Sequence, residues 1–539
     1  MAAILYAVIL LLFFAVYVPL NNYRLTRLPK EAAAFSPVRW TPESVREDAA
    51  KLAQKLPITI NDQLPPKTGR RYIVVGGVLA TFYSSSLKLL TKRVFSIQAG
   101  FLGGWIVCSL LERGESPSHI RILDIRPPVR DDLNAALEQG VSFIQVDVSD
   151  LAAVDAAFTA PWPSISSSPS SDSKPELTVY HTAANIRFYE RHPVFLSRSA
   201  RVNFTGTQNV VNASRKAGAT VLVYTSSGSV GVRSSRFFLW PWEKEPNHFL
   251  QIIGDDDSML PKRHEDFFSN YAVSKLKAEV LVRGADRSAT GDGNGDKVLR
   301  TGCIRPGNGV FGPRGDILCG AYLVRRSNPT WTGNILQSFC YVENCALAHL
   351  CYEERLIALL DSSSKKLPDI GGQAFIIADP GPPPTYGDAY TALTTLSKGE
   401  CTFPSLHPTP MLILATLIER YSLLQFFSSS GAWGSLGKVV GSFLPPVTGD
   451  LVNLQPSLFA LTSVHLVMDD SRARKSPQEG GLGYVGKWTT LQGIVKTVDE
   501  HRKELSLDRE REGRGEGGRK GRSEMAGISF DWRKSKRAK

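Results

Sequence analysis

Cysteine and histidine are scarce in this chain, and neither is arranged as a metal site requires. The seven cysteines include no Cys-x-x-Cys pair, and the nine histidines include no His-x-x-x-His pair. Cys340, Cys345 and Cys351 are spaced too irregularly to hold zinc. The sequence therefore predicts no metal. An odd number of cysteines without a disulfide framework is typical of a reducing compartment.

Charge is missing from the beginning of the chain, because residues Ala2 to Leu20 have no charged side chain. A helix of that length spans about 28 Å, close to the hydrocarbon thickness of a bilayer. A cleaved signal peptide and a buried helix are the alternatives, but no basic segment precedes the run and no small-x-small cleavage site follows it. Residues 1–21 are therefore predicted to be an uncleaved single-pass anchor, and 22–69 a linker. Basic residues follow the run, so the positive-inside rule predicts a cytosolic body: Arg24, Arg27, Lys30 and Arg39.

The run Ser-Asn-Tyr-Ala-Val-Ser-Lys contains two residues with distinctive chemistry, Tyr271 and Lys275. They are four residues apart in a helical pattern, so both side chains lie on one face. An ammonium group one turn away favours the phenolate and lowers the pKa of a tyrosine toward the range of a base. Because the same spacing is common on solvated helices, the neighbouring segments decide its meaning.

Three segments precede that helix, and each alone could be a strand end, a turn or a helix cap. The β-branched run Ala219–Tyr224 ends in Thr225-Ser-Ser227, where the hydroxyl groups lie at the ligand-binding edge of an open α/β sheet. An earlier run, Leu177–Tyr180, ends in His181-Thr-Ala-Ala184, and Val202-Asn-Phe-Thr-Gly-Thr207 opens a helix. Their common order makes coincidence a poor explanation.

Together these segments resemble the 3β-hydroxysteroid dehydrogenase family of the extended short-chain dehydrogenase/reductases. Further segments match the family pattern: Ile304-Arg-Pro306, Phe311-Gly-Pro313, Tyr341-Val-Glu-Asn344 and Ala348-His-Leu350. Within the family, Asp124-Ile-Arg-Pro-Pro128 and Gly372–Asp379 look like fungal sterol C-4 decarboxylating dehydrogenases. The likeness runs from about Arg70 to about Lys503, most of the chain.

The resemblance implies an α/β fold with a Rossmann-type, doubly wound parallel sheet and a smaller C-terminal substrate domain. Residues 70–310 would form the NAD-binding domain, and 311–500 the substrate-binding region, interleaved with the last elements of the sheet. Tyr271 would be the base, Lys275 would hold the nicotinamide ribose, and Ser227 would hydrogen-bond the substrate oxygen. The cofactor would contact Tyr271, Lys275, Gly76, Gly77, Gly100, Phe101, Leu102, Gly103, Asp124, Asp147, Val148, Thr182, Ala183 and Pro306. His181 is predicted to be structural rather than catalytic.

The glycine-rich cofactor turn departs from the family pattern. Gly76-Gly77 follows the first strand, but the expected continuation, Ala99-Gly-Phe-Leu-Gly103, comes only after the segment Val78–Gln98. Without this segment the chain reads as the family's Gly-x-x-Gly-x-x-Gly fingerprint, which brings backbone N–H groups close to pyrophosphate. The segment is interpreted as a translated intron or as a loop excursion, and the short geometry of a phosphate turn favours the intron. As a loop it is expected to lie exposed and to weaken NAD binding.

Nucleotide choice depends on the end of the second predicted strand, Ile120–Asp124. A carboxylate there accepts hydrogen bonds from ribose hydroxyls and repels a 2′-phosphate, so NAD is predicted over NADP. Arg126 could accommodate a phosphate, which leaves NADP as the alternative. By resemblance Asp147 lies near the adenine. Ser149 and Asp150 are better placed than Asp147 to cap the next helix.

The resemblance implies oxidation of the 3β-hydroxyl of a 4α-carboxysterol with loss of carbon dioxide, at the endoplasmic reticulum membrane. Expected partners are a sterol or steroid-like substrate, the membrane and a sterol C-4 demethylation complex, with no nucleic acid. One alternative is oxidation or reduction of another steroid, triterpenoid or isoprenoid alcohol. A second is an inactive membrane-tethered scaffold subunit, which the interrupted glycine turn would favour.

Three other segments have an unusual composition. Pro410–Ile418 and Leu423–Phe427 are apolar but are separated by Glu419-Arg420, and charges at the centre of a span are costly. An interfacial helix or a cover of a sterol cleft is predicted there, with a core helix as the open alternative. Residues 161–176, rich in Ser and Pro, read as a surface loop. Residues 501–539 carry 13 Lys+Arg against 7 Asp+Glu, and are predicted to be a disordered solvated tail, with anionic lipid or RNA as possible partners.

Overall fold

The computed structural model describes residues 2–54, 60–76, 100–163, 175–291, 297–316, 318–361, 367–430 and 443–513, together with 434, 437 and 441. The predicted insertion 78–98, most of the Ser/Pro-rich loop and residues 514–539 lie outside these ranges. The side chains of residues 1–13, the outer part of the predicted anchor, also lie outside the description.

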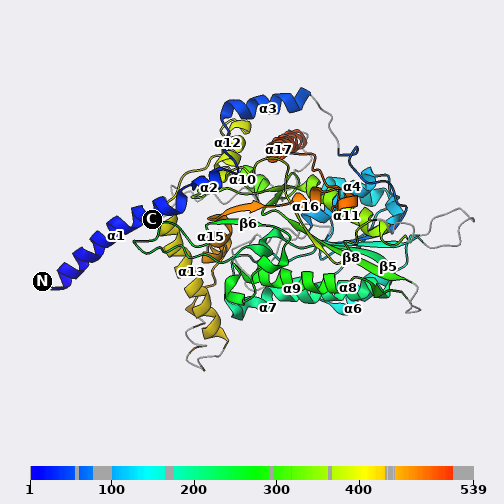
Figure 1. The fold of residues 1–539 in the computed structure, drawn as a ribbon, viewed down its shortest axis with the longest axis horizontal. Coiled ribbons are helices and arrows are strands. Elements are labelled where there is room, and N and C mark those ends of the chain that lie inside the picture. The colour runs from blue at the N-terminus through cyan, green and yellow to red at the C-terminus, as the bar shows by residue number, and fades with distance from the viewer. Residues whose placement is uncertain are drawn as a thin grey trace, which may run out of the picture.

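A parallel sheet runs through the body of the protein (Figure 1). Its strands follow the order β11-β8-β5-β4-β1-β2-β3, with the short β7 antiparallel to β8. Their bounds are β1 Arg71–Val75, β2 Ile120–Asp124, β3 Ser142–Gln145, β4 Leu177–His181, β5 Ala219–Thr225, β7 Ser288–Ala289, β8 Val298–Pro306 and β11 Ala374–Ile377. The strand order reverses between β1 and β4, and Val75 lies in register with Leu123 and His181, so the carboxyl ends meet at one edge. The predicted doubly wound fold is confirmed.

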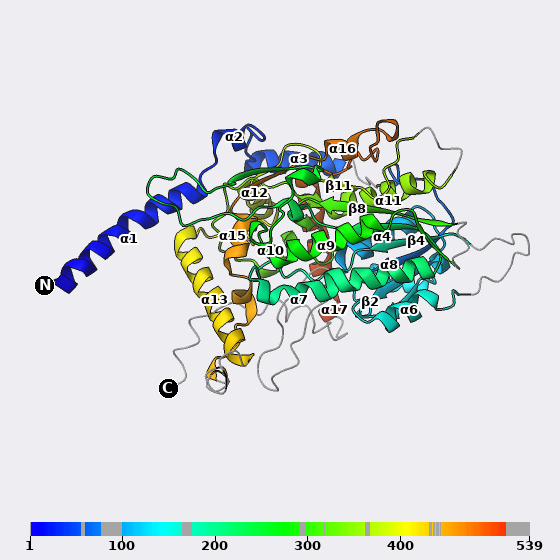
Figure 2. The same cartoon turned by 60° about the horizontal axis from the view of Figure 1, so that its bottom comes forward.

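Helices cover both faces of this sheet, so its strands read as continuous apolar runs. Tyr72 and Val74 of β1 pack in one cluster with α4 (Phe101–Glu112), α5 (Asp131–Glu138) and α11 (Val342–Ala358). Ile73 and Val75 pack in the opposite cluster with α6 (Leu151–Thr159), α8 (Thr207–Lys216) and α9 (Asn270–Gly284). Figure 2 shows α8 and α9 side by side along one face.

A further apolar cluster lies beyond the carboxyl edge of the sheet. It contains residues of α10 (Cys319–Arg325), α12 (Tyr386–Leu396), α13 (Pro408–Ser429), α15 (Pro456–Thr462) and α17 (Thr490–Gly513). The strands β6 (Leu250–Ile253) and β12 (His465–Met468) pair in parallel within it. The chain between Ser227 and Tyr271 thus packs with the C-terminal region, while α17 continues into the predicted tail as far as Gly513.

The N-terminal helix α1 (Ala2–Thr26) projects away from the body, as Figures 1 and 2 both show. The predicted linker contains α2 (Lys30–Ala33) and α3 (Pro42–Gln54), and the chain before α3 docks on α12. There the Asp388 carboxylate accepts the Trp40 N–H at 2.8 Å and pairs with Arg39 at 2.6 Å. Among the side chains that the structure describes, those of one helix, α13, are apolar enough over a sufficient length to cross a membrane.

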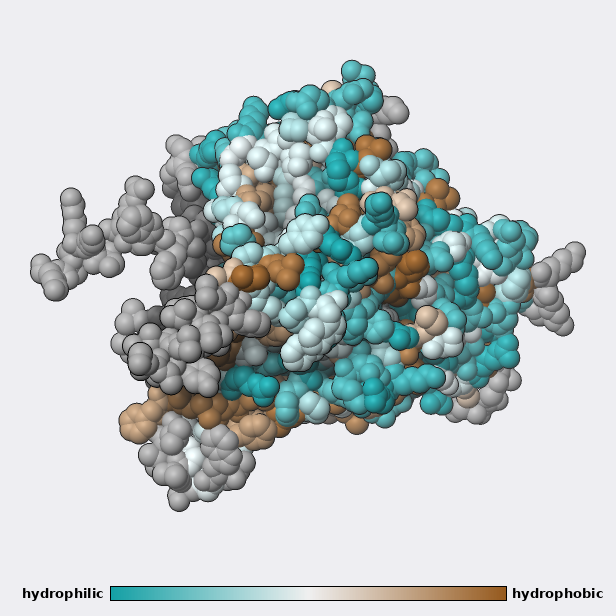
Figure 3. Space-filling view, turned by 60° about the vertical axis from the view of Figure 1, so that its left-hand side comes forward, coloured by the Kyte–Doolittle hydropathy of each residue, from teal (hydrophilic) through white to brown (hydrophobic). Residues whose placement is uncertain are grey.

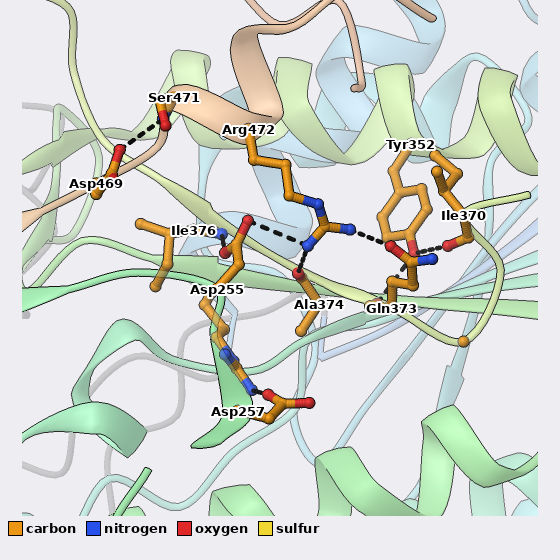
Figure 4. A network of polar contacts seen from close by, with 12 residues as sticks. Asp255, Asp257, Tyr352, Ile370, Gln373, Ala374, Ile376, Asp469, Ser471 and Arg472 are labelled. Carbon is orange, nitrogen blue, oxygen red and sulfur yellow. Dashed lines mark hydrogen bonds and ion pairs between the residues drawn. The ribbon is translucent and has the colours of Figure 1, made fainter. Parts of the chain in front are cut away.

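A polar network covers β11, the edge strand of the sheet (Figure 4). Arg472, on α16 (Ser471–Arg474), donates to the Ala374 carbonyl at 3.2 Å, pairs with Asp255 at 3.3 Å and bonds the Gln373 side chain. Asp255 also accepts the Ile376 N–H at 2.6 Å. These contacts fasten the segment after β6 and the C-terminal chain to the Rossmann sheet, so the substrate side and the cofactor side are held in one geometry.

Candidate active site

The structure brings the three predicted catalytic residues together at the carboxyl edge of the sheet. Tyr271 and Lys275 lie in the first turns of α9, where the Ser269 hydroxyl caps the helix by accepting the Ala272 N–H at 3.4 Å. Ser227 follows β5; its hydroxyl lies 2.7 Å from the Ser229 hydroxyl and close enough to Tyr271 to lower the pKa of that phenol. Lys275 Nζ donates to the Thr225 carbonyl at 2.6 Å. Tyr271 is 8% exposed and Lys275 1% exposed, so the site is shielded from water.

Burial dominates the protonation of this pair. It raises the pKa of Tyr271 to about 12, which the hydrogen bond from Ser227 only partly offsets. Burial also lowers the pKa of Lys275 to about 7, against the opposing effects of Cys303 and Glu279. The sequence predicted a lowered tyrosine pKa, and the direction here is the reverse because desolvation of the buried phenolate outweighs the lowering effect of Ser227. Tyr271 is therefore a phenol at neutral pH.

Beside Thr225 lies a histidine for which the motifs predicted no role. His349 is fully buried on α11, and its Nδ1 lies 2.7 Å from the Cys345 carbonyl. A carbonyl only accepts, so Nδ1 carries the proton and Nε2 accepts from the Thr225 hydroxyl at 2.7 Å. The Thr225 side chain is thereby held by His349 while its carbonyl receives Lys275. The segment Ala348-His-Leu350 was visible in the sequence, but only the fold brings it to Thr225.

A second unpredicted support is Asn203, which lies buried in the π-helical turn Arg201–Gly206. Its Oδ1 accepts the Asn185 N–H at 2.7 Å, and its Nδ2 donates to the Ser274 hydroxyl at 2.9 Å. Ser274 lies between the two catalytic residues of α9 and donates to the Tyr271 carbonyl at 2.8 Å. The π turn is a frequent companion of functional sites, and here it fixes the first turn of α9.

His181 ends β4 and is fully buried. Its Nε2 lies 2.9 Å from the Thr207 hydroxyl, which itself donates to the Asn203 carbonyl at 2.6 Å, so His181 is the donor. Burial and, to a smaller extent, repulsion by Lys275 lower the pKa of His181 to about 3. A histidine that stays neutral throughout the physiological range agrees with the predicted structural role.

The two halves of the predicted phosphate turn lie where a Rossmann fold requires them. Gly76 directly follows β1 with φ +86°, and a Cβ there would lie 2.5 Å from the Ala183 nitrogen. Thr182 donates to the Gly76 carbonyl at 2.9 Å. Gly100 begins α4, whose first turn contains the buried residues Phe101, Leu102 and Gly103. This glycine cradle before a helix N-terminus fits the pyrophosphate of NAD. Gly77, Ala99 and the segment between them lie outside the described residues.

The predicted adenine side is less uniform. Asp124 is the last residue of β2, is nearly buried, and accepts the Arg126 N–H at 3.4 Å. Asp147 accepts both the backbone N–H and the hydroxyl of Ser149, at 2.9 and 2.7 Å. Asp150, as expected, caps α6 by accepting the Ala153 N–H. A carboxylate at the end of β2 fits a ribose, so Asp124 supports NAD.

Val148 and Pro306 lie at two borders of the site. The Val148 carbonyl accepts from the Asn209 side chain at 2.9 Å, and a Cβ at Gly206 would meet Val148 at 2.7 Å. Pro306 ends β8 beside the loop after Ser227, where a Cβ at Gly228 would lie 2.7 Å from the Pro306 carbonyl oxygen. Both residues therefore lie at the edge where the cofactor was predicted.

A cavity of about 890 Å³ opens on the substrate side. Its wall includes residues 233–238, parts of 258–266, and Leu412 and Thr416 of α13. In sequence, the first two segments lie between Ser227 and Tyr271, although neither residue is among those that line the cavity. The wall combines apolar side chains of α13 with basic ones, among them Arg191, Arg233 and Arg236.

The sequence profile of the 3-beta hydroxysteroid dehydrogenase/isomerase family matches residues 98–399, more than half of the chain. The chain therefore belongs to this family, as its motifs predicted. The family description names hydroxysteroid dehydrogenases and isomerases.

Two curated relatives are from Arabidopsis thaliana: 3beta-hydroxysteroid-dehydrogenase/decarboxylase isoform 2, 28% identical over 70% of this chain, and isoform 1, 27% identical over 71%. A third, the decarboxylating sterol-4-alpha-carboxylate 3-dehydrogenase of Candida albicans, is 30% identical over 34% of this chain. The aligned region spans 57%, 73% and 45% of these relatives' own lengths, respectively.

Proposed function

We propose that this protein oxidises the 3β-hydroxyl of a 4α-carboxysterol with NAD and that the product loses carbon dioxide. The observation that carries the proposal is the convergence of Ser227, Tyr271 and Lys275 at the carboxyl edge of the sheet, beside the glycine cradle at Gly76. The relatives named for sterol dehydrogenation and decarboxylation support the substrate class.

The oxidation step separates a proton from a hydride. Tyr271 accepts the proton of the 3β-hydroxyl while Ser227 donates a hydrogen bond to the substrate oxygen and positions it. NAD, when bound, takes the hydride from C3. Because burial raises the pKa of Tyr271 to about 12, the tyrosine acts as an acceptor in its minor deprotonated form. Lys275 is held by the Thr225 carbonyl, and the Thr225 side chain is held by His349.

Decarboxylation follows from the product of that step. Oxidation at C3 makes the carboxylate at C4 part of a β-keto acid. Its carbon–carbon bond to the carboxylate then breaks with the electron pair moving into the ketone as an enolate, and protonation of that enolate gives the 3-ketosterol. No further group is required, since the ketone accepts the charge.

The setting of the reaction is part of the proposal. The apolar N-terminal run and its continuous helix α1 support a single-pass anchor in the endoplasmic reticulum membrane with the body in the cytosol. A sterol C-4 demethylation complex is the partner that the substrate class implies. The volume of the cavity against α13 supports a bulky substrate, and the basic residues in its wall are compatible with a carboxylate on that substrate.

The direct test is turnover of a 4α-carboxysterol, with NADH and the 3-ketosterol measured together. Tyr271→Phe removes the base and should reduce the rate by at least about 100-fold while the protein remains folded. Tyr484→Phe is the matched control, because its hydroxyl donates to the Ala378 carbonyl away from the site. A wild-type rate in Tyr271→Phe would refute the assignment.

An inactive scaffold is the second candidate, because the segment Val78–Gln98 separates the two halves of the glycine fingerprint. Loss of two or three pyrophosphate hydrogen bonds, each contributing about 1.5–3 kcal/mol, would weaken NAD binding by several orders of magnitude. For an inactive scaffold, calorimetry would show little NAD binding by the full chain and restored binding after removal of residues 78–98. Micromolar binding by the full chain would contradict this expectation and favour the enzyme.

A further inference from the structure

Helix α13 is apolar on two opposite sides. Leu412, Ala415 and Ile418 are buried in the substrate-side cluster. Ile413, Leu414, Leu417 and Leu424, spaced at one to two turns, are exposed, with Leu417 at 60%. Figure 3 shows this side of the molecule with an apolar band at its lower edge. A surface helix of a soluble protein turns polar side chains outward, so the outer side of α13 has an apolar environment.

Two tryptophans extend this surface. Trp240 and Trp242 stack on each other, with ring centroids 5.4 Å apart and an interplanar angle of 2°, and are 56% and 75% exposed. Their loop is held in place, because Arg24 of α1 donates to the Trp240 and Pro241 carbonyls at 3.0 and 2.7 Å. Tryptophans in such a fixed, exposed position are characteristic of the membrane–water interface.

One buried side chain joins all three segments. Asn21, in α1, donates to the Phe237 carbonyl at 3.1 Å and to the Thr409 hydroxyl at 2.9 Å. It therefore links the projecting apolar helix, the tryptophan loop and the beginning of α13 at one corner of the body. Since α1 leaves the body here, a bilayer that receives α1 also lies against the other two segments.

We propose that the outer side of α13 and the Trp240–Trp242 pair form a second membrane contact, in which α13 lies along the lipid surface and does not cross it. The inner side of α13 argues against crossing. Glu419, near the middle of the helix, is nearly buried and makes a bidentate ion pair with Arg191 at 2.6 and 2.8 Å. A spanning helix would have to leave the core and break that pair.

Charge identifies the kind of lipid. Arg420 is exposed on α13 beside Leu417, and within the described part of the chain it makes no ion pair or hydrogen bond. A guanidinium next to leucines in a membrane contact reaches the headgroups and favours anionic ones. The cavity of about 890 Å³ has Leu412 of α13 and Phe237 in its wall, next to charged residues that include Arg233 and Arg236. A lipid-dissolved substrate would therefore reach it directly from the bilayer; this last step rests on the proposed function.

The contact is tested on the full chain in vesicles, with an environment-sensitive fluorophore on a single added cysteine. Trp242→Cys and Leu417→Cys probe the surface, and Leu151→Cys is the control, an exposed leucine on α6 at the other end of the body. Selective labelling is feasible because the native cysteines are buried or, for Cys108, half-buried. Nitroxide lipids labelled near the headgroup or at the chain end report depth.

The expected result is strong quenching at positions 242 and 417 by the headgroup nitroxide, weaker quenching by the chain-end nitroxide, and none at 151. Quenching should increase when phosphatidylserine replaces neutral lipid. Equal signals at 417 and 151 would refute the contact, and stronger chain-end quenching at 417 would show a crossing helix. In detergent without vesicles, a fluorophore at position 417 that is shielded from water, together with the mass of a dimer, would identify the surface as an interface between two copies.

A second variant separates this inference from the proposed function. Leu414→Glu with Leu417→Glu should raise KM for a vesicle-dissolved sterol by about tenfold or more, while KM for detergent-dispersed sterol stays unchanged. Leu151→Glu is the control. If the sterol is not turned over at all but the quenching pattern holds, the proposed function fails and the membrane contact stands. An unchanged KM in vesicles would overturn the access route.

Discussion

The buried ion pair between Arg305 and Glu279 joins β8 to the catalytic helix α9, and its removal should destabilise the protein strongly. Glu279 accepts from Arg305 Nε at 3.0 Å and from Nη2 at 2.5 Å, and both side chains are fully buried. Asp257, which is partly exposed, pairs with Arg305 Nη2 at 2.8 Å. Glu279→Gln keeps the size of the side chain but leaves the guanidinium without its buried counter-charge, which costs about 3–5 kcal/mol.

A loss of that size should lower Tm by roughly 3–5 °C, measured by thermal unfolding of the purified full chain at fixed pH and salt. Glu47→Gln makes the same chemical change in the exposed pair with Lys51 on α3 and should leave Tm unchanged. A Tm for Glu279→Gln equal to that of Glu47→Gln would refute the reasoning. It would mean that Asp257 alone compensates the buried guanidinium.

Three further predictions concern the active site. Because burial raises the pKa of Tyr271 to about 12, the rate of oxidation should rise with pH between about 7 and 9.5 as more phenolate forms, and a flat profile of initial rates would contradict its role as base. His349→Ala leaves the Thr225 hydroxyl without its acceptor and should lower the free energy of unfolding by about 1–3 kcal/mol. It should also reduce kcat more than it changes KM, and His349→Gln should recover part of the stability and part of kcat. An unchanged kcat in the alanine variant would show that the contact is dispensable. Asp124→Ala, assayed with NAD and NADP in parallel, should reduce the preference for NAD by about 10–100-fold, unless Arg126 already sets the preference.

Local sequence was sufficient for the parallel α/β architecture and for the position of the catalytic pair. The apolar runs of β1 and β5 predict strands because they are short, β-branched and bounded by turn residues. The four-residue spacing of Tyr271 and Lys275 places both on one face of any α-helix, whatever surrounds it. The glycines at 76 and 100 were placed correctly at a strand end and a helix start for the same reason: each depends on a few neighbouring residues.

Tertiary structure alone decided the protonation and the support of the site. The pKa of Tyr271 is raised rather than lowered because segments far apart in the chain pack around the phenol and remove water from it. His349 reaches Thr225 across 124 residues, a contact that no local period encodes. The same holds for α13, whose composition left a core helix and an interfacial helix equally open. Its neighbours Asn21 and Arg191, both distant in sequence, fix which side of the helix is buried and which stays exposed.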